Sequence, residues 1–167
     1  MTTLKRSCRV DASVDATAII KLLKKKGLTV TTAESITGGG LGEALTAVPG
    51  SSAVFPGGLI TYSDVTKTKF LGVTKRILNK FTAVSEEVAV EMARGARAQF
   101  KTDYAISTTG VAGPGRAYGQ KVGTVWIAID SKAGTTSVQL ALAGSRAEIR
   151  HATIESALAT FTRILIP

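Results

Sequence analysis

The order of its apolar patterns constrains this chain more than any other feature. Short runs rich in β-branched residues predict strands at 28–33, about 57–62 and 103–109, with helical patterns between them. Two further strands, 123–130 and 135–143, are separated only by the turn residues 132–134, which predicts a hairpin. Helices between strands, followed by a hairpin, predict an α/β protein with a mixed sheet covered on both faces.

The helical patterns have clear boundaries. An amphipathic pattern over about residues 15–26 ends at Gly27, and another runs through 41–45. Ser63 or Asp64 is expected to cap a short helix that ends near Gly72. The clearest helix is predicted from Ser85 to about residue 100, and the last from about 145 to 164.

The chain length is that of one domain. Its 167 residues suffice to bury a core, and we expect a flexible N-terminal leader over 1–14 followed by one domain over 15–167. The leader lacks the apolar stretch of a signal peptide, and no apolar run is long enough to cross a bilayer. The single cysteine, Cys8, excludes an internal disulfide. These features predict a cytoplasmic protein that is not bound to a membrane.

The net charge of +9 indicates an anionic partner, either nucleic acid or a phosphorylated small molecule. The cations are spread over the polar faces of several predicted helices, and aromatic residues make up only 5% of the chain. Nucleic acid is therefore the less favoured partner. Ordinary solvated helix faces explain the same charges without any partner.

Two glycine-rich loops follow predicted strands, where ligands of open α/β sheets usually bind. The first is Thr37-Gly38-Gly39-Gly40, and the second begins at Thr109-Gly110. Because the first loop leads into a helix, its free N–H groups and the helix dipole predict an anion site beside Ser35 and Thr37. Neither loop matches a P-loop or a GxGxxG motif, and tight turns explain each loop equally well.

The segment 49–67 concentrates the groups that could carry covalent chemistry: Ser51, Ser52, Tyr62 and Lys67. A serine needs a base, and the only histidine, His151, falls on an apolar stripe that predicts a packing position. A neutral lysine can take that role, and burial near a helix start would lower the pKa of Lys67. An ordinary surface cation and a packing tyrosine are the alternative interpretation.

Two further expectations concern ligands. One histidine and one cysteine cannot build a zinc site, so neither a metal nor a cofactor is expected. Arg146, at the predicted start of the last helix, can clamp a phosphate or carboxylate, or serve only as a solvated charge at the helix end.

Eight sequence blocks resemble the CinA C-terminal domain family, in the family's order from about residue 15 to the C-terminus. They are 32–35 (TAES), 37–39 (TGG), 49–52 (PGSS), 61–63 (TYS), 71–73 (LGV), 83–86 (AVSE), 109–114 (TGVAGP) and 122–125 (VGTV). Studied members of that family include nicotinamide mononucleotide deamidases.

The resemblance implies a single three-layer α/β/α domain. The implied activity is hydrolysis of the carboxamide of nicotinamide mononucleotide to nicotinate mononucleotide and ammonia, in pyridine nucleotide recycling. Ser52 resembles the nucleophile, although Ser51 is the neighbouring alternative, and Tyr62 and Lys67 resemble its activating partners. The implied substrate-binding set is Ser35, Thr37, Gly38, Gly39, Ser51, Thr109, Gly110 and Arg146. The expected partners are this phosphorylated substrate and further copies of the chain in a homo-oligomer.

Three positions depart from the family pattern. Ile36 stands where a cysteine is frequent, and Ser145 stands where an aspartate is frequent. The loop 115–121 reads GRAYGQK and is basic, whereas the family loop is rich in Gly, Ser and Glu. The alternative function is a non-catalytic nucleotide-binding or DNA-associated protein linked to competence and DNA damage.

Overall fold

The computed structural model describes residues 16–166, so Cys8 and the leader predicted over 1–14 lie outside the described residues. Its sheet has five strands in the order β2-β1-β3-β4-β5. The central strand pair is parallel, and the last two strands form the predicted antiparallel hairpin. The strands are β1 (Val30–Glu34), β2 (Gly58–Ile60), β3 (Tyr104–Gly110), β4 (Thr124–Ser131) and β5 (Gly134–Ala141).

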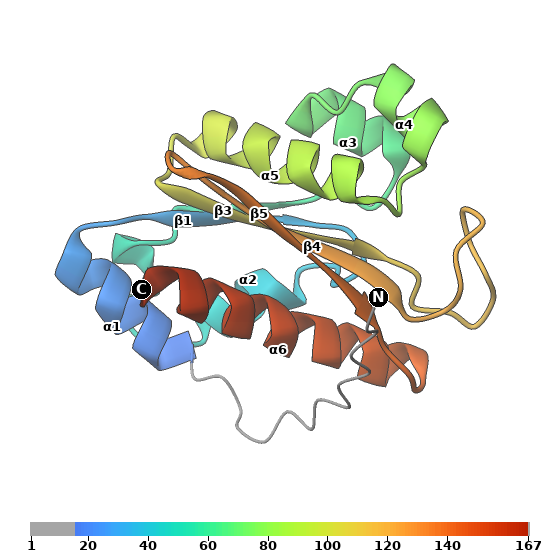
Figure 1. The fold of residues 1–167 in the computed structure, drawn as a ribbon. Coiled ribbons are helices and arrows are strands. Elements are labelled where there is room, and N and C mark those ends of the chain that lie inside the picture. The colour runs from blue at the N-terminus through green and yellow to red at the C-terminus, as the bar shows by residue number, and fades with distance from the viewer. Residues whose placement is uncertain (1–15, 167) are drawn as a thin grey trace, which may run out of the picture.

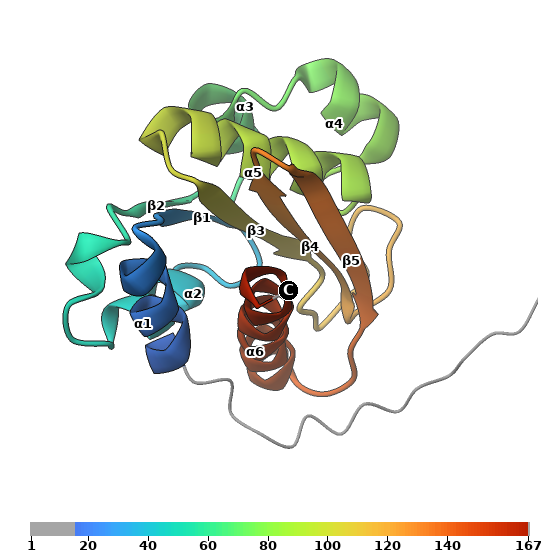
Figure 2. The same ribbon diagram turned by 60° about the vertical axis from the view of Figure 1, so that its left-hand side comes forward.

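Helices cover both faces of the sheet, as Figures 1 and 2 show. One layer holds α1 (Ala16–Lys26), α2 (Gly40–Thr46) and α6 (Arg146–Leu165). The other layer holds α3 (Asp64–Leu71), α4 (Lys75–Phe81) and α5 (Glu86–Phe100). A 3-10 turn, η1 (Ser51–Ala53), precedes β2. The predicted three-layer α/β/α domain with a mixed sheet is confirmed, and none of the described helices is long and apolar enough to cross a membrane.

Each face of the sheet has its own apolar core. In α6, every fourth residue is buried, through Ile149, Thr153, Ala157 and Phe161. The predicted packing position of His151 is therefore wrong. Two residues beyond Ile149, a side chain is rotated about 200° around the helix and faces solvent. The His151 side chain is 73% exposed and lies 3.3 Å from Glu155.

Local sequence signals define both ends of the short helix α3. Ser63 caps it by accepting from the N–H of Thr66, and Thr66 reciprocates to complete a capping box. Gly72 ends the helix in the left-handed conformation, with φ of 71°. Lys67, the fourth residue of this helix, is buried. This short helix thus carries a lysine toward the sheet rather than toward solvent.

The parallel pairing of β1 with β3 determines where a site can form. Glu34 pairs with Thr108, so the two strands end at the same edge of the sheet. The ladder continues for one more residue, because the N–H of Ser35 donates to the carbonyl of Thr108 at 2.9 Å. Ser35 and the loop after Gly110 therefore meet at the carboxyl ends of the strands, the usual ligand position in such sheets.

Candidate active site

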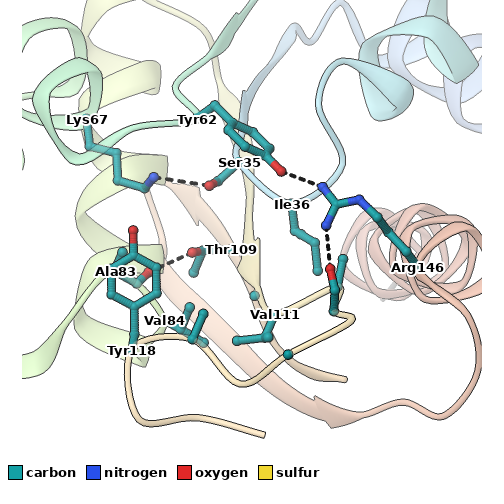
Figure 3. A pocket seen from close by; sticks show the side chains of 15 residues that line it. Ser35, Ile36, Tyr62, Lys67, Ala83, Val84, Thr109, Val111, Tyr118 and Arg146 are labelled. Atoms are coloured by element: carbon teal, nitrogen blue, oxygen red, sulfur yellow. Dashed lines mark hydrogen bonds between the residues drawn. The ribbon is translucent and has the colours of Figure 1, made fainter. Parts of the chain in front are cut away.

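A cavity of about 170 Å³ opens at this edge, between the ends of β1 and β3 (Figure 3). An engineered cavity of about 150 Å³ accepts benzene, so this one has room for a single aromatic ring with a small substituent. Its walls come from the ends of β1 and β3, the start of α3, the α4–α5 connection, the β3–β4 loop and the start of α6. The residues that line it include Ser35, Ile36, Tyr62, Lys67, Val84, Thr109, Gly110, Val111, Tyr118 and Arg146.

Lys67 is the most unusual residue of this cavity, because a lysine seldom lies inside a protein unpaired. Its side chain is only 1% exposed, and its Nζ lies 3.1 Å from Ser35 Oγ and 2.9 Å from the carbonyl oxygen of Thr61. Among the described residues, no carboxylate forms an ion pair with it. Burial lowers the pKa of Lys67, while the charge of Asp64 opposes that shift.

Ser35 is held rigidly opposite this amine. Beyond its ladder bond to Thr108, the turn that follows is tied to α6 by Arg150. The Arg150 guanidinium donates to the carbonyl of Ile36 at 3.1 Å and to that of Thr37 at 2.7 Å. A serine hydroxyl on a fixed backbone, within hydrogen-bond reach of a buried amine, is the geometry of an activated nucleophile.

Glu34 fills the anion site that the sequence predicted at the start of α2. Its carboxylate is buried and accepts backbone N–H bonds from Gly39, Leu41 and Gly42 at 2.9, 3.0 and 2.7 Å. The Thr37 hydroxyl adds a bond of 2.7 Å. The expectation that this helix end binds a ligand phosphate is therefore wrong, because a carboxylate of the preceding strand already neutralises it.

The loop residues predicted with that anion site fall outside the cavity. Thr37 is fully buried between Glu34 and Thr108, and Gly39 is the N-cap of α2. Gly38 adopts a φ of 59°, and a side chain there would meet the Arg150 guanidinium at 3.3 Å. These residues shape the turn that holds Ser35, and neither the threonine nor the glycines line the cavity.

The structure separates Ser52 from Lys67, which corrects the expected arrangement. Ser52 is exposed in η1, and Val54 of the same segment accepts from the N–H of Val30, at the start of β1. Ser35 follows the other end of that strand, roughly 16 Å away at about 3.3 Å per residue. Ser51 is buried beside Ser52 and also lies outside the cavity lining. Closeness along the chain had grouped residues that the fold places at opposite ends of β1.

The remaining predicted residues do line the cavity. Arg146 donates to the Tyr62 hydroxyl at 2.6 Å and to the carbonyl of Gly113 at 2.8 Å, as Figure 3 shows. The Thr109 hydroxyl donates to a backbone carbonyl of the α4–α5 connection at 2.6 Å, so it is a structural contact at the cavity wall. At Gly110, a Cβ would approach Thr124 O within 2.8 Å, which explains the glycine.

Sequence reasoning missed the roles of Glu34, Arg150 and Tyr118. One signal could have identified Ser35 as more than a binding residue. It stands at the turn between a buried strand and a helix, where α/β-hydrolases expose a nucleophile. The described residues contain no group of three metal-ligating side chains. What the cavity holds instead is a serine and a buried amine at its base, with a guanidinium and a phenol at its mouth.

Relatives share both the sequence and the fold. The model of the CinA C-terminal domain matches residues 13–165. The chain is 42% identical over 154 residues to a CinA-like protein of Parasynechococcus marenigrum and 43% identical over 149 residues to a putative competence-damage inducible protein of Caldicellulosiruptor saccharolyticus. These alignments cover 90% and 89% of this chain but only 37% and 36% of the relatives, so the chain spans about a third of their length.

The fold of this chain matches solved structures over nearly their whole length. The competence/damage inducible protein CihA of Agrobacterium tumefaciens is 37% identical, with a TM-score of 0.87 over 91% of this chain and 95% of that one. A competence or damage-inducible protein of Enterobacter asburiae is 32% identical, with a TM-score of 0.90 over 93% and 99%. On these matches, the chain belongs to the CinA C-terminal domain family.

Proposed function

We propose that this protein is an amidohydrolase that converts nicotinamide mononucleotide to nicotinate mononucleotide and ammonia, in cytoplasmic pyridine nucleotide recycling. One observation carries the hydrolase part of the proposal: the buried amine of Lys67 lies 3.1 Å from Ser35 Oγ. The choice of substrate rests on the family resemblance. Ser35 takes the place of Ser52 as the nucleophile, because Ser35 is the serine that the fold brings to the lysine.

Burial explains how a lysine can act as the base. In the neutral form, one N–H of Lys67 donates to the Thr61 carbonyl, and the lone pair accepts the hydrogen bond of the Ser35 hydroxyl. As Ser35 Oγ bonds to the carboxamide carbon, its proton moves to Lys67 Nζ. The C–N bond then breaks, and the leaving group takes that proton and departs as ammonia.

The second half of the reaction uses the same base. A water molecule attacks the acyl carbon and gives one proton to Lys67, and the bond to Ser35 Oγ breaks. Lys67 returns the proton to the serine, and the acid product leaves. The negative oxygen that develops in each step needs N–H donors. Ile36, the residue after the nucleophile, is the candidate, because its N–H donates to no other group among the described residues.

The cavity suits one end of the substrate, and its mouth suits the other. A volume of about 170 Å³ accepts the pyridine ring and its amide but not a whole nucleotide, so the ribose phosphate must extend outward. Arg146 stands at the mouth and uses two of its five N–H groups on Tyr62 and Gly113. The other three are available to a phosphate. Arg146 thus takes the anion-binding role that the sequence predicted for the start of α2, which Glu34 already neutralises.

The decisive experiment compares the two serines. Wild-type protein is expected to release ammonia from nicotinamide mononucleotide. Ser35→Ala should reduce kcat by a factor of about 10³ or more, with an unchanged circular dichroism spectrum. Ser52→Ala is the matched control and should retain full activity, because Ser52 is exposed at the far end of β1. The proposal fails if the wild-type protein releases no ammonia, and the Ser35 assignment fails if Ser52→Ala is the inactive variant.

A further inference from the structure

Tyr118 occupies a position that a tyrosine adopts only at a cost. It lies in the loop between β3 and β4, where Ala117 and Gln120 exchange backbone hydrogen bonds of 3.3 and 2.9 Å. The two residues between them, Tyr118 and Gly119, have φ of 53° and 74°. Positive φ at both central positions is the geometry of a type I′ turn, whose first central residue is usually Asn, Asp or Gly. A bulky residue there stores backbone strain.

The strained residue faces the candidate active site. Tyr118 lines the cavity together with Ser35 and Lys67, and the residue as a whole remains 49% exposed. In Figure 3 the ring rises from its loop on the side of the cavity where Lys67 lies, across from Arg146. The turn therefore presents the largest flat surface of the loop to the space beside the nucleophile.

The carboxylate of Asp64 influences the Tyr118 phenol electrostatically. Burial raises the pKa of the Tyr118 phenol, and the negative charge of Asp64 raises that pKa further. The phenol therefore stays protonated at neutral pH. One oxygen of Asp64, Oδ1, is buried without a hydrogen bond among the described residues. This carboxylate lies at the start of α3, and Tyr118 belongs to another segment of the chain, so the two sides of the cavity come from distant parts of the sequence.

We propose that Tyr118 determines substrate specificity, its ring forming the wall of the cavity on which a flat aromatic carboxamide stacks. This inference rests on the proposed function for the position of the amide at Ser35. The cavity accepts one aromatic ring, and stacking on a tyrosine face adds affinity for flat, unsaturated groups without requiring hydrogen bonds to them.

The test measures binding rather than turnover, in the Ser35→Ala background, by calorimetric titration. The probes are nicotinamide mononucleotide and ribose 5-phosphate, which lacks the aromatic amide. Adding Tyr118→Asn should weaken binding of nicotinamide mononucleotide about tenfold and leave binding of ribose 5-phosphate unchanged. Adding Tyr118→Phe, which keeps the ring, should restore most of the affinity. The thermal midpoint of Tyr118→Asn should equal or exceed that of its parent, because asparagine tolerates positive φ.

Each result has a definite meaning. Equal affinity of the Asn variant and its parent for nicotinamide mononucleotide overturns the inference, as does equal weakening for both probes. Absence of binding by the parent also overturns it, because the wall would then have no aromatic ligand. The proposed function is judged separately, by ammonia release from the wild-type protein. A wild-type protein that binds the nucleotide through Tyr118 but releases no ammonia would leave this inference standing while the hydrolase proposal fails.

Discussion

The carboxylate of Glu34 accepts a hydrogen bond of 2.7 Å from the backbone N–H of Gly42, inside the first turn of α2. Glu34 is the residue directly before Ser35, so this bond fixes the end of β1 against the start of a helix. With the N–H groups of Gly39 and Leu41, three backbone donors converge on one buried carboxylate. The helix terminus thus serves to hold the backbone beside Ser35.

We expect Glu34→Gln to lower the free energy of unfolding by about 2–3 kcal/mol, the value of hydrogen bonds to a buried charged group. An amide keeps one acceptor oxygen, and its NH₂ group faces N–H donors that it cannot satisfy. Urea unfolding provides the measurement. Glu43→Gln is the matched control, since Glu43 is exposed on the same helix and should change stability by less than about 0.5 kcal/mol. Equal effects at the two positions would contradict the structural role of Glu34.

The pH profile of the proposed reaction tests the state of Lys67. The base must be neutral, so kcat/KM should rise about tenfold per pH unit up to an apparent pKa and then level off. Because burial lowers the pKa of Lys67, the apparent pKa at which the profile levels off should lie below 10.5, the ordinary value for a lysine. The charge of Asp64 raises the same pKa. Asp64→Asn should therefore move the apparent pKa of the kcat/KM profile to lower pH. Glu155→Gln, on the outer face of α6, should leave this apparent pKa unchanged.

Lys67 also predicts a pH dependence of stability that needs no substrate. Its pKa is lower in the folded state than in the unfolded state, so the unfolded state binds more protons between those two values. Stability from this group therefore rises as the pH rises through that window, which ends near 10.5. Lys67→Met removes the effect. The free energy of unfolding of wild type minus that of Lys67→Met should increase from neutral to alkaline pH, measured by urea denaturation at each pH. A difference that is constant with pH would mean that the amine titrates normally.

The sequence predicted the fold well because its signals are local. The cap at Ser63, the glycine at Gly72 and the hairpin residues 132–134 each act within a few positions. Most of the element order followed from such signals. The helix α4 was not placed by them, although Thr74 is an N-cap that accepts from the N–H of Ile77. Its seven residues contribute one buried side chain, Leu78, and so leave little periodicity to read.

The site was only partly predictable because it is assembled from distant segments. Lys67 and Ser35 are 32 positions apart, and they meet because β1 lies between β2 and β3. The family resemblance pointed to Ser52, which is 15 positions from Lys67 and lies at the other end of β1. The anion site was misassigned for a similar reason. Free N–H groups at a helix start attract a carboxylate of the protein as readily as a ligand, and Glu34 is already in place.

Gly95 of α5 should connect stability to the position of Lys67. A Cβ at this glycine would lie 1.9 Å from the carbonyl oxygen of Leu71, the last residue of α3. In an exposed helix interior, alanine is about 1 kcal/mol better than glycine, but here the contact with backbone cannot relax without moving α3. We expect Gly95→Ala to destabilise the protein by about 1–3 kcal/mol, measured by urea unfolding.

The comparison with Ala98 reveals whether that contact is the cause. Ala98 is exposed on the same helix, and Ala98→Gly should cost about 1 kcal/mol through helix propensity alone. If the protein is more stable with glycine than alanine at position 95, but more stable with alanine than glycine at position 98, the close packing of α3 against Gly95 is the cause. Because α3 carries Lys67 one turn before Leu71, its displacement should also lower ammonia release in protein that remains fully folded. Ala98→Gly should leave that rate unchanged, and a Gly95→Ala variant as stable and active as the wild type would contradict the close packing of α3 on α5.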